Sequence, residues 1–263
     1  MLRVMTYNIL DGGHTREHEI VEVIRTASPN VVVLQEVIDE DALRSMAHHL
    51  QMKYFLADGN RDRRVALLSQ LPIENFKSCH PVFPIWHNFI EATIRAPSGE
   101  VFRLIGVHLV ANPWIVFEFW RLLEILYILR HIRQYSNEPC LMAGDFNSVA
   151  PGDRVIRSTM PIRLKFILWS QGNRVYRFAL QTLLSSEFID CFRLKNSTDD
   201  GFTLPPPAPT IRLDYGFINP AMEKYVKNCW VVREPHNVTK ASDHYPVMVE
   251  LNFENKEGNG NLK

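Results

Sequence analysis

Two short runs of consecutive apolar residues constrain the fold of this chain most strongly. Val31–Leu34 and Cys140–Ala143 contain apolar residues only, with no alternation between apolar and polar positions. A strand that is apolar on both sides must be covered on both sides, which is typical of a sheet that lies between other layers. Apolar residues with helical spacing at Ile20–Ala27 precede the first run and complete a strand, helix, strand unit. The sequence therefore predicts a mixed α/β protein.

The rest of the pattern predicts more strands and helices, separated by turn-forming residues. Further strands are expected at Arg3–Ile9, Tyr54–Ala57, Val65–Leu68, Ile90–Ile94, Val101–His108, Leu213–Ile218, Cys229–Val232 and Tyr245–Phe253, and helices at Asp41–Leu50, Phe117–Tyr135 and Tyr176–Ser185. The sequence has no internal repeat of about 20–50 residues and no interior linker. We therefore expect one domain over residues 1–253, followed by a frayed polar tail at 254–263.

Three charged residues interrupt the most apolar stretch of the chain, Trp114–Arg130. Glu118, Arg121 and Glu124 leave no run of the roughly 18 uncharged residues that a membrane span requires. Because they fall within about 120° of one helical face, they predict an amphipathic helix packed on a sheet. The alternative is a helix that lies on a membrane surface. The N-terminus has no apolar signal segment, so a cytoplasmic location is expected.

Composition removes several classes of function. Lys and Arg number 29, Asp and Glu also 29, and the pI is about 7.2, below the value of about 9 typical of a dedicated nucleic-acid-binding domain. The four cysteines are far apart and form no CxxC pair, which predicts reduced, buried thiols. Zinc-protease, serine-hydrolase, P-loop and dinucleotide-binding motifs do not occur in the sequence.

Carboxylate and amide side chains follow the short apolar strands. Loops at strand ends are where layered α/β folds gather their functional side chains, so we expect these residues to meet. Oxygen ligands without cysteine favour Mg²⁺ or Mn²⁺ over zinc. The residues concerned are Asn8, Glu36, Asp145, Asn147, Asp214 and the pair Asp243-His244.

The order of seven short blocks resembles the endonuclease/exonuclease/phosphatase superfamily over residues 4–251. The blocks are Thr6-Tyr7-Asn8, Leu34-Gln35-Glu36-Val37, Val65-Ala66-Leu67-Leu68-Ser69, Val107-His108-Leu109, Gly144-Asp145-Phe146-Asn147, Arg212-Leu213-Asp214-Tyr215 and Ser242-Asp243-His244-Tyr245-Pro246-Val247. The resemblance implies a four-layer α/β sandwich, with two packed mixed β-sheets flanked by helices. It also implies a site at one edge of the sandwich and metal-dependent hydrolysis of a phosphoester.

The resemblance also implies the metal ligands. Glu36 is expected to bind Mg²⁺ or Mn²⁺, with Asn8 in the polar shell of that site and Asp243 assisting. Such an ion polarises a phosphoryl oxygen and offsets the negative charge that develops during hydrolysis.

The catalytic roles follow in the same way from the resemblance. Asp145 is expected to orient and deprotonate the attacking water, while Asn147 positions the phosphate or the nucleophile. Asp214 is expected to hold His244, which stabilises the phosphorane or protonates the leaving oxygen. His108 is expected to contact the phosphate.

The basic residues leave the substrate open. The segment Arg154–Arg177 carries six positive charges and no acid, interleaved with aromatic residues. Basic groups bind phosphates and aromatic rings stack on bases, which favours a nuclease acting on DNA or RNA. Arg63 and Arg64 lie in a basic loop whose guanidinium groups suit phosphate, and together with Arg154 and Arg177 they are the candidate substrate-binding residues.

Two other functions stay open at this stage. The same basic and aromatic mixture suits an anionic membrane surface, so hydrolysis of a phospholipid head group, as in a sphingomyelinase, or of a small phosphoester is the alternative. A binding module that kept the fold without catalysis is the further alternative. The sequence implies no protein partner, and we expect a monomer.

Overall fold

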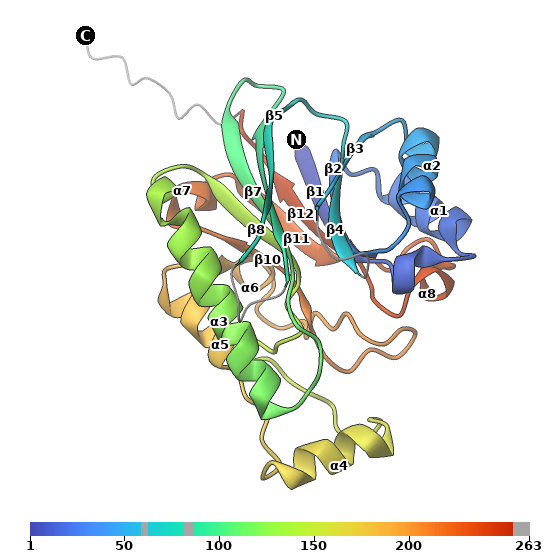
Figure 1. The fold of residues 1–263 in the computed structure, drawn as a ribbon, viewed down its shortest axis with the longest axis vertical. Coiled ribbons are helices and arrows are strands. Elements are labelled where there is room, and N and C mark those ends of the chain that lie inside the picture. Colours follow the sequence, from blue (N-terminus) through green and yellow to red (C-terminus); the bar gives the residue numbers. More distant parts are fainter. Residues whose placement is uncertain (59–62, 82–86, 255–263) are drawn as a thin grey trace.

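The computed structural model describes residues 1–58, 63–81 and 87–254 and contains two six-stranded sheets packed face to face (Figure 1). Their strand orders are β11-β12-β1-β2-β4-β3 and β5-β6-β7-β8-β10-β9. The first sheet consists of β1 (Leu2–Asn8), β2 (Val31–Val37), β3 (Lys53–Leu56), β4 (Arg64–Ser69), β11 (Val226–Val231) and β12 (Val247–Leu251). The second consists of β5 (Ile73–Cys79), β6 (Phe89–Arg95), β7 (Val101–His108), β8 (Cys140–Asp145), β9 (Ile189–Asp190) and β10 (Asp214–Ile218).

Helices cover the outer faces of both sheets (Figure 1). Helices α1 (Glu17–Ala27) and α2 (Glu40–Leu50) pack on the first sheet, and α3 (Ile115–Ile132) and α5 (Phe178–Ser185) pack on the second. The remaining helices are α4 (Ile162–Ser170), α6 (Cys191–Lys195), α7 (Pro220–Glu223), α8 (Val238–Ala241) and the 3₁₀ turns η1 (Asp11–Gly13) and η2 (Arg133–Tyr135). The expected four-layer α/β sandwich is confirmed.

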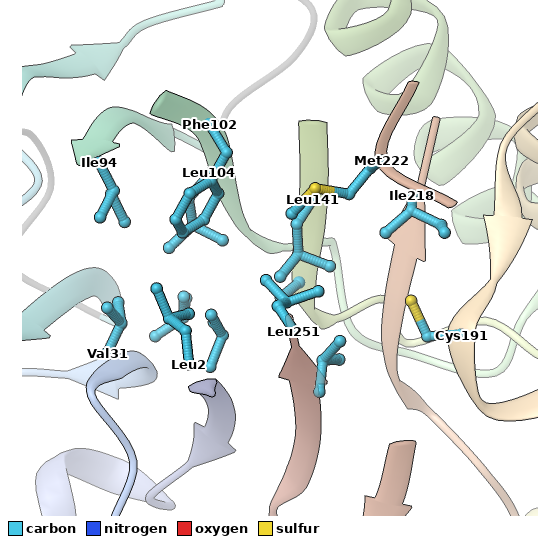
Figure 2. Close-up of a cluster of buried hydrophobic side chains, with 14 of the residues drawn as sticks. Leu2, Val31, Ile94, Phe102, Leu104, Leu141, Cys191, Ile218, Met222 and Leu251 are labelled. Carbon is cyan, nitrogen blue, oxygen red and sulfur yellow. The ribbon is translucent and has the colours of Figure 1, made fainter. Parts of the chain in front are cut away.

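Side chains from both sheets fill the space between them (Figure 2). Leu2 and Val31 of the first sheet lie opposite Phe102 and Leu104 of the second. The neighbouring residue Val32 belongs instead to the cluster beneath α1 and α2, because successive side chains of a strand point to opposite faces. Strand β2 is therefore covered on both sides, as its apolar run predicted.

Several elements were not predicted from the sequence: strand β5, helix α4, and the short elements β9, α6, α7, α8, η1 and η2. Strand β5 lies at the edge of its sheet, where exposed Glu74 and Lys77 interrupt the apolar pattern. Helix α4 is apolar on most sides, so it lacks the periodicity by which an amphipathic helix is recognised. The expected tail falls largely at residues 255–263, outside the described residues. The four cysteines are buried, as predicted.

Helix α3 packs on the second sheet as predicted, but its charged face points inward. Glu118, Arg121 and Glu124 are each at most 4% exposed, while Phe119 and Leu123 are 50% and 41% exposed. This orientation is the reverse of the usual amphipathic helix, which keeps its charges in water. None of the described helices is long and apolar enough to cross a membrane.

The inward charges of α3 bind the chain that follows β7. Arg121 pairs with Glu118 at 2.9 Å and donates to the carbonyl oxygens of Val110 and Asn112 at 2.8 and 2.9 Å. Glu124 accepts a hydrogen bond from the Val110 amide at 3.0 Å. Buried charges are tolerated when they are paired and hydrogen-bonded in this way. These hydrogen bonds fix the loop that follows β7.

A second buried charge cluster holds the chain after β8. The Arg212 side chain, 1% exposed, donates to Asp153 Oδ2 at 2.8 Å and to Asp190 Oδ1 at 3.1 Å. Asp190 also caps the first turn of α6 by accepting from the Phe192 amide. Arg212 thereby joins the loop after β8 to the end of β9.

Removing the Arg212 charge should destabilise the protein strongly. Arg212→Met leaves Asp153 and Asp190 buried without their cation, so we expect a loss of about 3–5 kcal/mol in the free energy of unfolding. The matched control is Arg3→Met, because Arg3 pairs with Glu250 but is 41% exposed and should lose less than about 1 kcal/mol. Urea denaturation measures both, and equal losses would contradict a structural role for the Arg212 cluster.

Candidate active site

The candidate site lies where strands of both sheets end. Asn8 ends β1, His108 ends β7 and Asp145 ends β8, while Asp214 begins β10. In the second sheet the pairing places His108 and Asp214 on either side of Asp145. Because the two sheets pack face to face, the ends of β1 and β2 lie against this edge.

A bulge turns Glu36 into the site. The register between β2 and β4 shifts between Leu34 and Val37, and Glu36 has a φ of 64°. A residue other than glycine with positive φ is uncommon, and such residues gather at functional sites. The bulge re-aims the Glu36 side chain, since an extra residue in one strand changes which face the next side chain takes.

The Asn8 amide bridges two carboxylates from different sheets. Its Nδ2 donates to Glu36 Oε1 at 3.2 Å and to Asp145 Oδ2 at 3.0 Å. The amide orientation is fixed because Asn8 Oδ1 accepts from the Leu10 amide at 3.0 Å. Glu36 Oε2 accepts from the Asp11 amide at 2.8 Å. Both carboxylates are buried, and the Asn8 amide group lies between them as a shared hydrogen-bond donor.

Asn147 completes the hydrogen bonds of Asp145. Its backbone amide donates to Asp145 Oδ1 at 2.9 Å, and its Nδ2 donates to Asp145 Oδ2 at 3.2 Å. The same Nδ2 also donates to the carbonyl oxygen of Leu109 at 3.0 Å. The Asp145 carboxylate is therefore fixed in one orientation and receives hydrogen bonds on both oxygens.

His244 and Asp214 form a buried pair that faces Asp145. His244 Nδ1 lies 2.8 Å from Asp214 Oδ2, and His244 Nε2 lies 4.0 Å from Asp145 Oδ2. Burial lowers the pKa of His244, but the carboxylates of Asp214 and Asp145 outweigh burial and raise this pKa to about 10. The ring is therefore a cation at neutral pH, with its Nε2–H directed at the site.

His108 is the second histidine of the site and is held in a different state. Its Nε2 lies 3.8 Å from Asp145 Oδ2 and 4.0 Å from Glu36 Oε1. Within the described part of the chain, neither ring nitrogen has a hydrogen-bond partner. Burial lowers the pKa of His108 despite the two carboxylates, so the ring is neutral. It retains one donor and one acceptor for a ligand.

The oxygen atoms around Glu36 fit a hard divalent cation. Asp243 Oδ1 is buried and has no hydrogen-bond partner among the described residues. Burial, together with the charges of Glu36 and Asp145, raises the pKa of Asp243, although the neighbouring His244 opposes this rise. Carboxylate and amide oxygens are the donors that Mg²⁺ and Mn²⁺ prefer.

A second group of side chains also meets the geometric condition for a metal site. Ligand atoms of Asp145, Asp214 and His244 lie within 4.8 Å of one another. His244 Nδ1, however, is already hydrogen-bonded to Asp214, so this group has fewer ligand atoms free to bind a metal ion. Glu36 with Asn8 and Asp243 is the better candidate for holding the ion.

The four candidate substrate arginines are not all at the site. Arg63 pairs with Asp11 at 3.0 Å and its Nε lies 3.9 Å from Glu36 Oε2, so this side chain borders the carboxylates. The other three bind other groups: Arg64 the carbonyl oxygen of Ile38 at 2.8 Å, Arg154 the Asp200 carboxylate at 2.8 Å, and Arg177 the carbonyl oxygens of Ala150 and Asp153.

Sequence reasoning missed His87. Its ring centroid lies 6.2 Å from that of His108, and its Nδ1 lies 2.7 Å from Glu124 Oε1. No local pattern marks His87, because its place beside the site depends on the inward orientation of α3.

Comparison with known proteins shows the family of this chain. The sequence profile of the Endonuclease/Exonuclease/phosphatase family matches residues 5–244. The chain belongs to this family. The match covers every residue of the candidate site described above. A search of curated protein sequences found no match.

Solved structures of family-like proteins share the fold. A 3′ phosphatase from Neisseria, bound to a product DNA hairpin, is 17% identical with a TM-score of 0.76, over 96% of this chain and all of that chain. An AP endonuclease from Archaeoglobus fulgidus is 17% identical with a TM-score of 0.77 over the same shares. A truncated TDP2 from Caenorhabditis elegans is 17% identical with a TM-score of 0.65, over 95% of this chain and 96% of that chain.

Metal binding at Glu36 should be visible as thermal stabilisation. A ligand present at about 100 times its Kd stabilises a protein by about 2.7 kcal/mol, so saturating Mg²⁺ or Mn²⁺ should raise the Tm by roughly 5–10 °C. Glu36→Gln should lose most of this rise, whereas Glu40→Gln, an exposed acid on α2, should keep it. Differential scanning calorimetry measures the rise, and a full rise in Glu36→Gln would place the ion elsewhere.

Proposed function

We propose that this family member is a divalent-metal-dependent phosphoesterase that hydrolyses its substrate by attack of water. The observation that carries the proposal is the bridge from the Asn8 amide to Glu36 and Asp145, with His244 4.0 Å from the same Asp145 oxygen. These side chains come from four separate stretches of sequence and two sheets. A purely structural role requires no such convergence of acids, amide and imidazolium.

Glu36, Asn8 and Asp243 would hold the Mg²⁺ or Mn²⁺ ion, which polarises a phosphoryl oxygen and offsets its developing charge. The nearby Arg63 guanidinium, 3.9 Å from Glu36, is placed to bind a second phosphoryl oxygen.

Asp145 acts as the general base. Both of its oxygens accept hydrogen bonds from Asn147 or Asn8, which orients the carboxylate toward a water molecule. As the water oxygen bonds to phosphorus, Asp145 takes its proton. Asn147 positions the phosphate or the nucleophile.

His244 supplies the proton that the leaving group needs. The imidazolium is charged before the reaction because Asp214 and Asp145 stabilise it. When the bond from phosphorus to the leaving oxygen breaks, His244 gives its Nε2 proton to that oxygen. Neutral His108 donates a hydrogen bond to a phosphoryl oxygen and stabilises its charge without adding a second cation.

A nucleic-acid substrate is supported by two observations. The segment 154–177 contains six basic residues and no acid, and the Arg154 side chain is 70% exposed despite its pair with Asp200. In addition, the similar Neisseria phosphatase is described as bound to a DNA hairpin. DNA or RNA hydrolysis is accordingly one substrate class to be tested, with a binding affinity that falls by about 0.9 log units per phosphate contact for each tenfold rise in salt.

Turnover should depend on the named residues. With Mg²⁺ or Mn²⁺ and bis(p-nitrophenyl) phosphate, Asp145→Asn and His244→Asn should each lower kcat by about 10²–10⁴-fold, the usual contribution of a positioned acid or base. Glu36→Ala should abolish metal-dependent turnover. Asp41→Asn, on an 82% exposed side chain, should keep it. Wild-type turnover in Asp145→Asn would contradict the general-base role.

A further inference from the structure

Most of the large apolar side chains that are exposed in the described residues lie on one surface. This surface, the α3–α4 face, comprises Trp114, Val116, Phe119, Leu123, Leu126, Ile162, Phe166, Trp169 and Phe178. The two helices are joined by Gln171, whose side chain accepts from the Ile115 amide at 2.9 Å and donates to the Pro113 carbonyl oxygen at 3.0 Å. Exposed apolar surfaces of this extent mark sites of interaction.

Helix α4 is the most exposed part of this face. It lies apart from both sheets at one end of the molecule (Figure 1). Ile162, Phe166 and Trp169 are 83%, 60% and 66% exposed, whereas Ile167 and Leu168 on the opposite side are buried. A helix that is apolar on most sides is stable when those sides contact apolar material, and α4 has such material on its inner side alone.

The exposed charges on residues 112–136 and 154–178, which carry the α3–α4 face, are positive, whereas exposed Glu187 lies beside Leu126 in the lining of one pocket. The two acids of α3, Glu118 and Glu124, are buried and bonded inward, and residues 154–178 contain no acid. No carboxylate is therefore exposed on residues 112–136 or 154–178, both of which are fully described. The exposed cations there are Arg130, Arg133, Arg154, Arg157, Arg163, Lys165 and Arg174, of which Arg154 pairs with Asp200. Aromatic and aliphatic residues among cations are typical of helices that lie on anionic membranes.

An apolar cavity lies beneath α4 and extends to Asn147 of the candidate active site. Its volume is about 610 Å³, within the range of about 300–1,000 Å³ that small-molecule sites occupy. The inner side of α4 lines it through Leu164 and Leu168, and the proline-rich loop 204–208 lines the other wall. Asn147, which donates to Asp145, lies in the same lining.

We propose that the substrate is a lipid phosphoester taken from an anionic membrane surface. The phosphate binds at Asp145 and His244, the hydrocarbon occupies the cavity beneath α4, and the α3–α4 face lies on the membrane. The proposal rests on the phosphoesterase function proposed above and names the substrate class for that same site. In this proposal the cations of the segment 154–177 contact the anionic membrane surface, and they need not contact the reacting phosphate.

The lipid accounts for features that a nucleic acid does not. Ile162, Val116 and Leu123 are aliphatic and offer no ring on which a base can stack. The cavity next to Asn147 is lined mainly by aliphatic and proline side chains, not by free cations. Arg177, which follows the lining residue Tyr176 in the sequence, donates to the carbonyl oxygens of Ala150 and Asp153. A groove that tracks a phosphate backbone would present such cations to its interior.

Vesicle binding tests the membrane contact. The full chain should cosediment with vesicles of phosphatidylcholine containing phosphatidylglycerol, and at least about tenfold less with phosphatidylcholine alone. The double variant Phe166→Glu/Trp169→Glu should lower binding to the anionic vesicles at least about tenfold, because two exposed aromatic rings are replaced by negative charges. Leu194→Glu, at an exposed leucine on α6 outside this face, should bind as the wild type does.

Turnover tests the cavity. We compare hydrolysis of long-chain phospholipid in anionic vesicles with hydrolysis of bis(p-nitrophenyl) phosphate. Leu164→Trp, which fills the cavity, should lower the ratio of lipid to soluble turnover at least about tenfold. Leu194→Trp lies outside the cavity lining and should leave the ratio unchanged.

The outcomes separate this proposal from the one on which it rests. Absence of metal-dependent turnover of every phosphoester would overturn the phosphoesterase function, whatever the vesicles show. Hydrolysis of the soluble diester without vesicle binding or lipid turnover would overturn the lipid proposal alone. Salt-sensitive DNA hydrolysis without vesicle binding would assign the site to nucleic acid. A dimer in light scattering that Phe166→Glu/Trp169→Glu dissolves, without vesicle binding, would assign the face to a second copy of the chain.

Discussion

One hydrogen bond of 3.0 Å, from the Asn8 amide to Asp145, joins the two sheets at the candidate site. It forms because the apolar side chains packed between the sheets hold the ends of β1 and β8 next to each other. The same amide also donates to Glu36. It therefore lies between two carboxylates, Asp145 and Glu36, whose negative charges would otherwise repel each other at short range. The proposed proton transfer at Asp145 and the proposed metal binding at Glu36 therefore depend on the packing of the two sheets, which positions side chains that no single element brings together.

The reversed orientation of α3 connects the site to the surface. Arg121 and Glu124 form hydrogen bonds with the backbone that follows His108, and Glu118 pairs with Arg121. The apolar residues of the helix therefore remain outside. A buried ion pair is costly to desolvate, and its hydrogen bonds to the loop offset that cost. One feature thus fixes a loop next to the reacting groups and leaves exposed the apolar face that we assign to a membrane.

Much of the fold was predictable because local rules agree with the tertiary structure there. The buried strands β2 and β8 and the helices α1 and α2 follow from composition and spacing, and the acids at the strand ends could be named individually. Helix α4 and His87 could not. Helix α4 has no polar side by which its period is visible, and His87 lies beside His108 because of contacts with α3. The arginines Arg154 and Arg177 have suitable chemistry for phosphate, but the structure gives each a different partner.

The sequence by itself determined the layered α/β class, the family and the acidic, amide and imidazole groups available for catalysis. These depend on residue type and on spacing along the chain, both of which are local. The tertiary structure alone decided which charges are buried, that His244 is held as a cation and His108 as a neutral ring, and that an apolar cavity opens beside Asn147. Burial, electrostatic coupling and cavity shape are set by residues far apart in sequence, so their effects become visible only once the sheets and helices are packed.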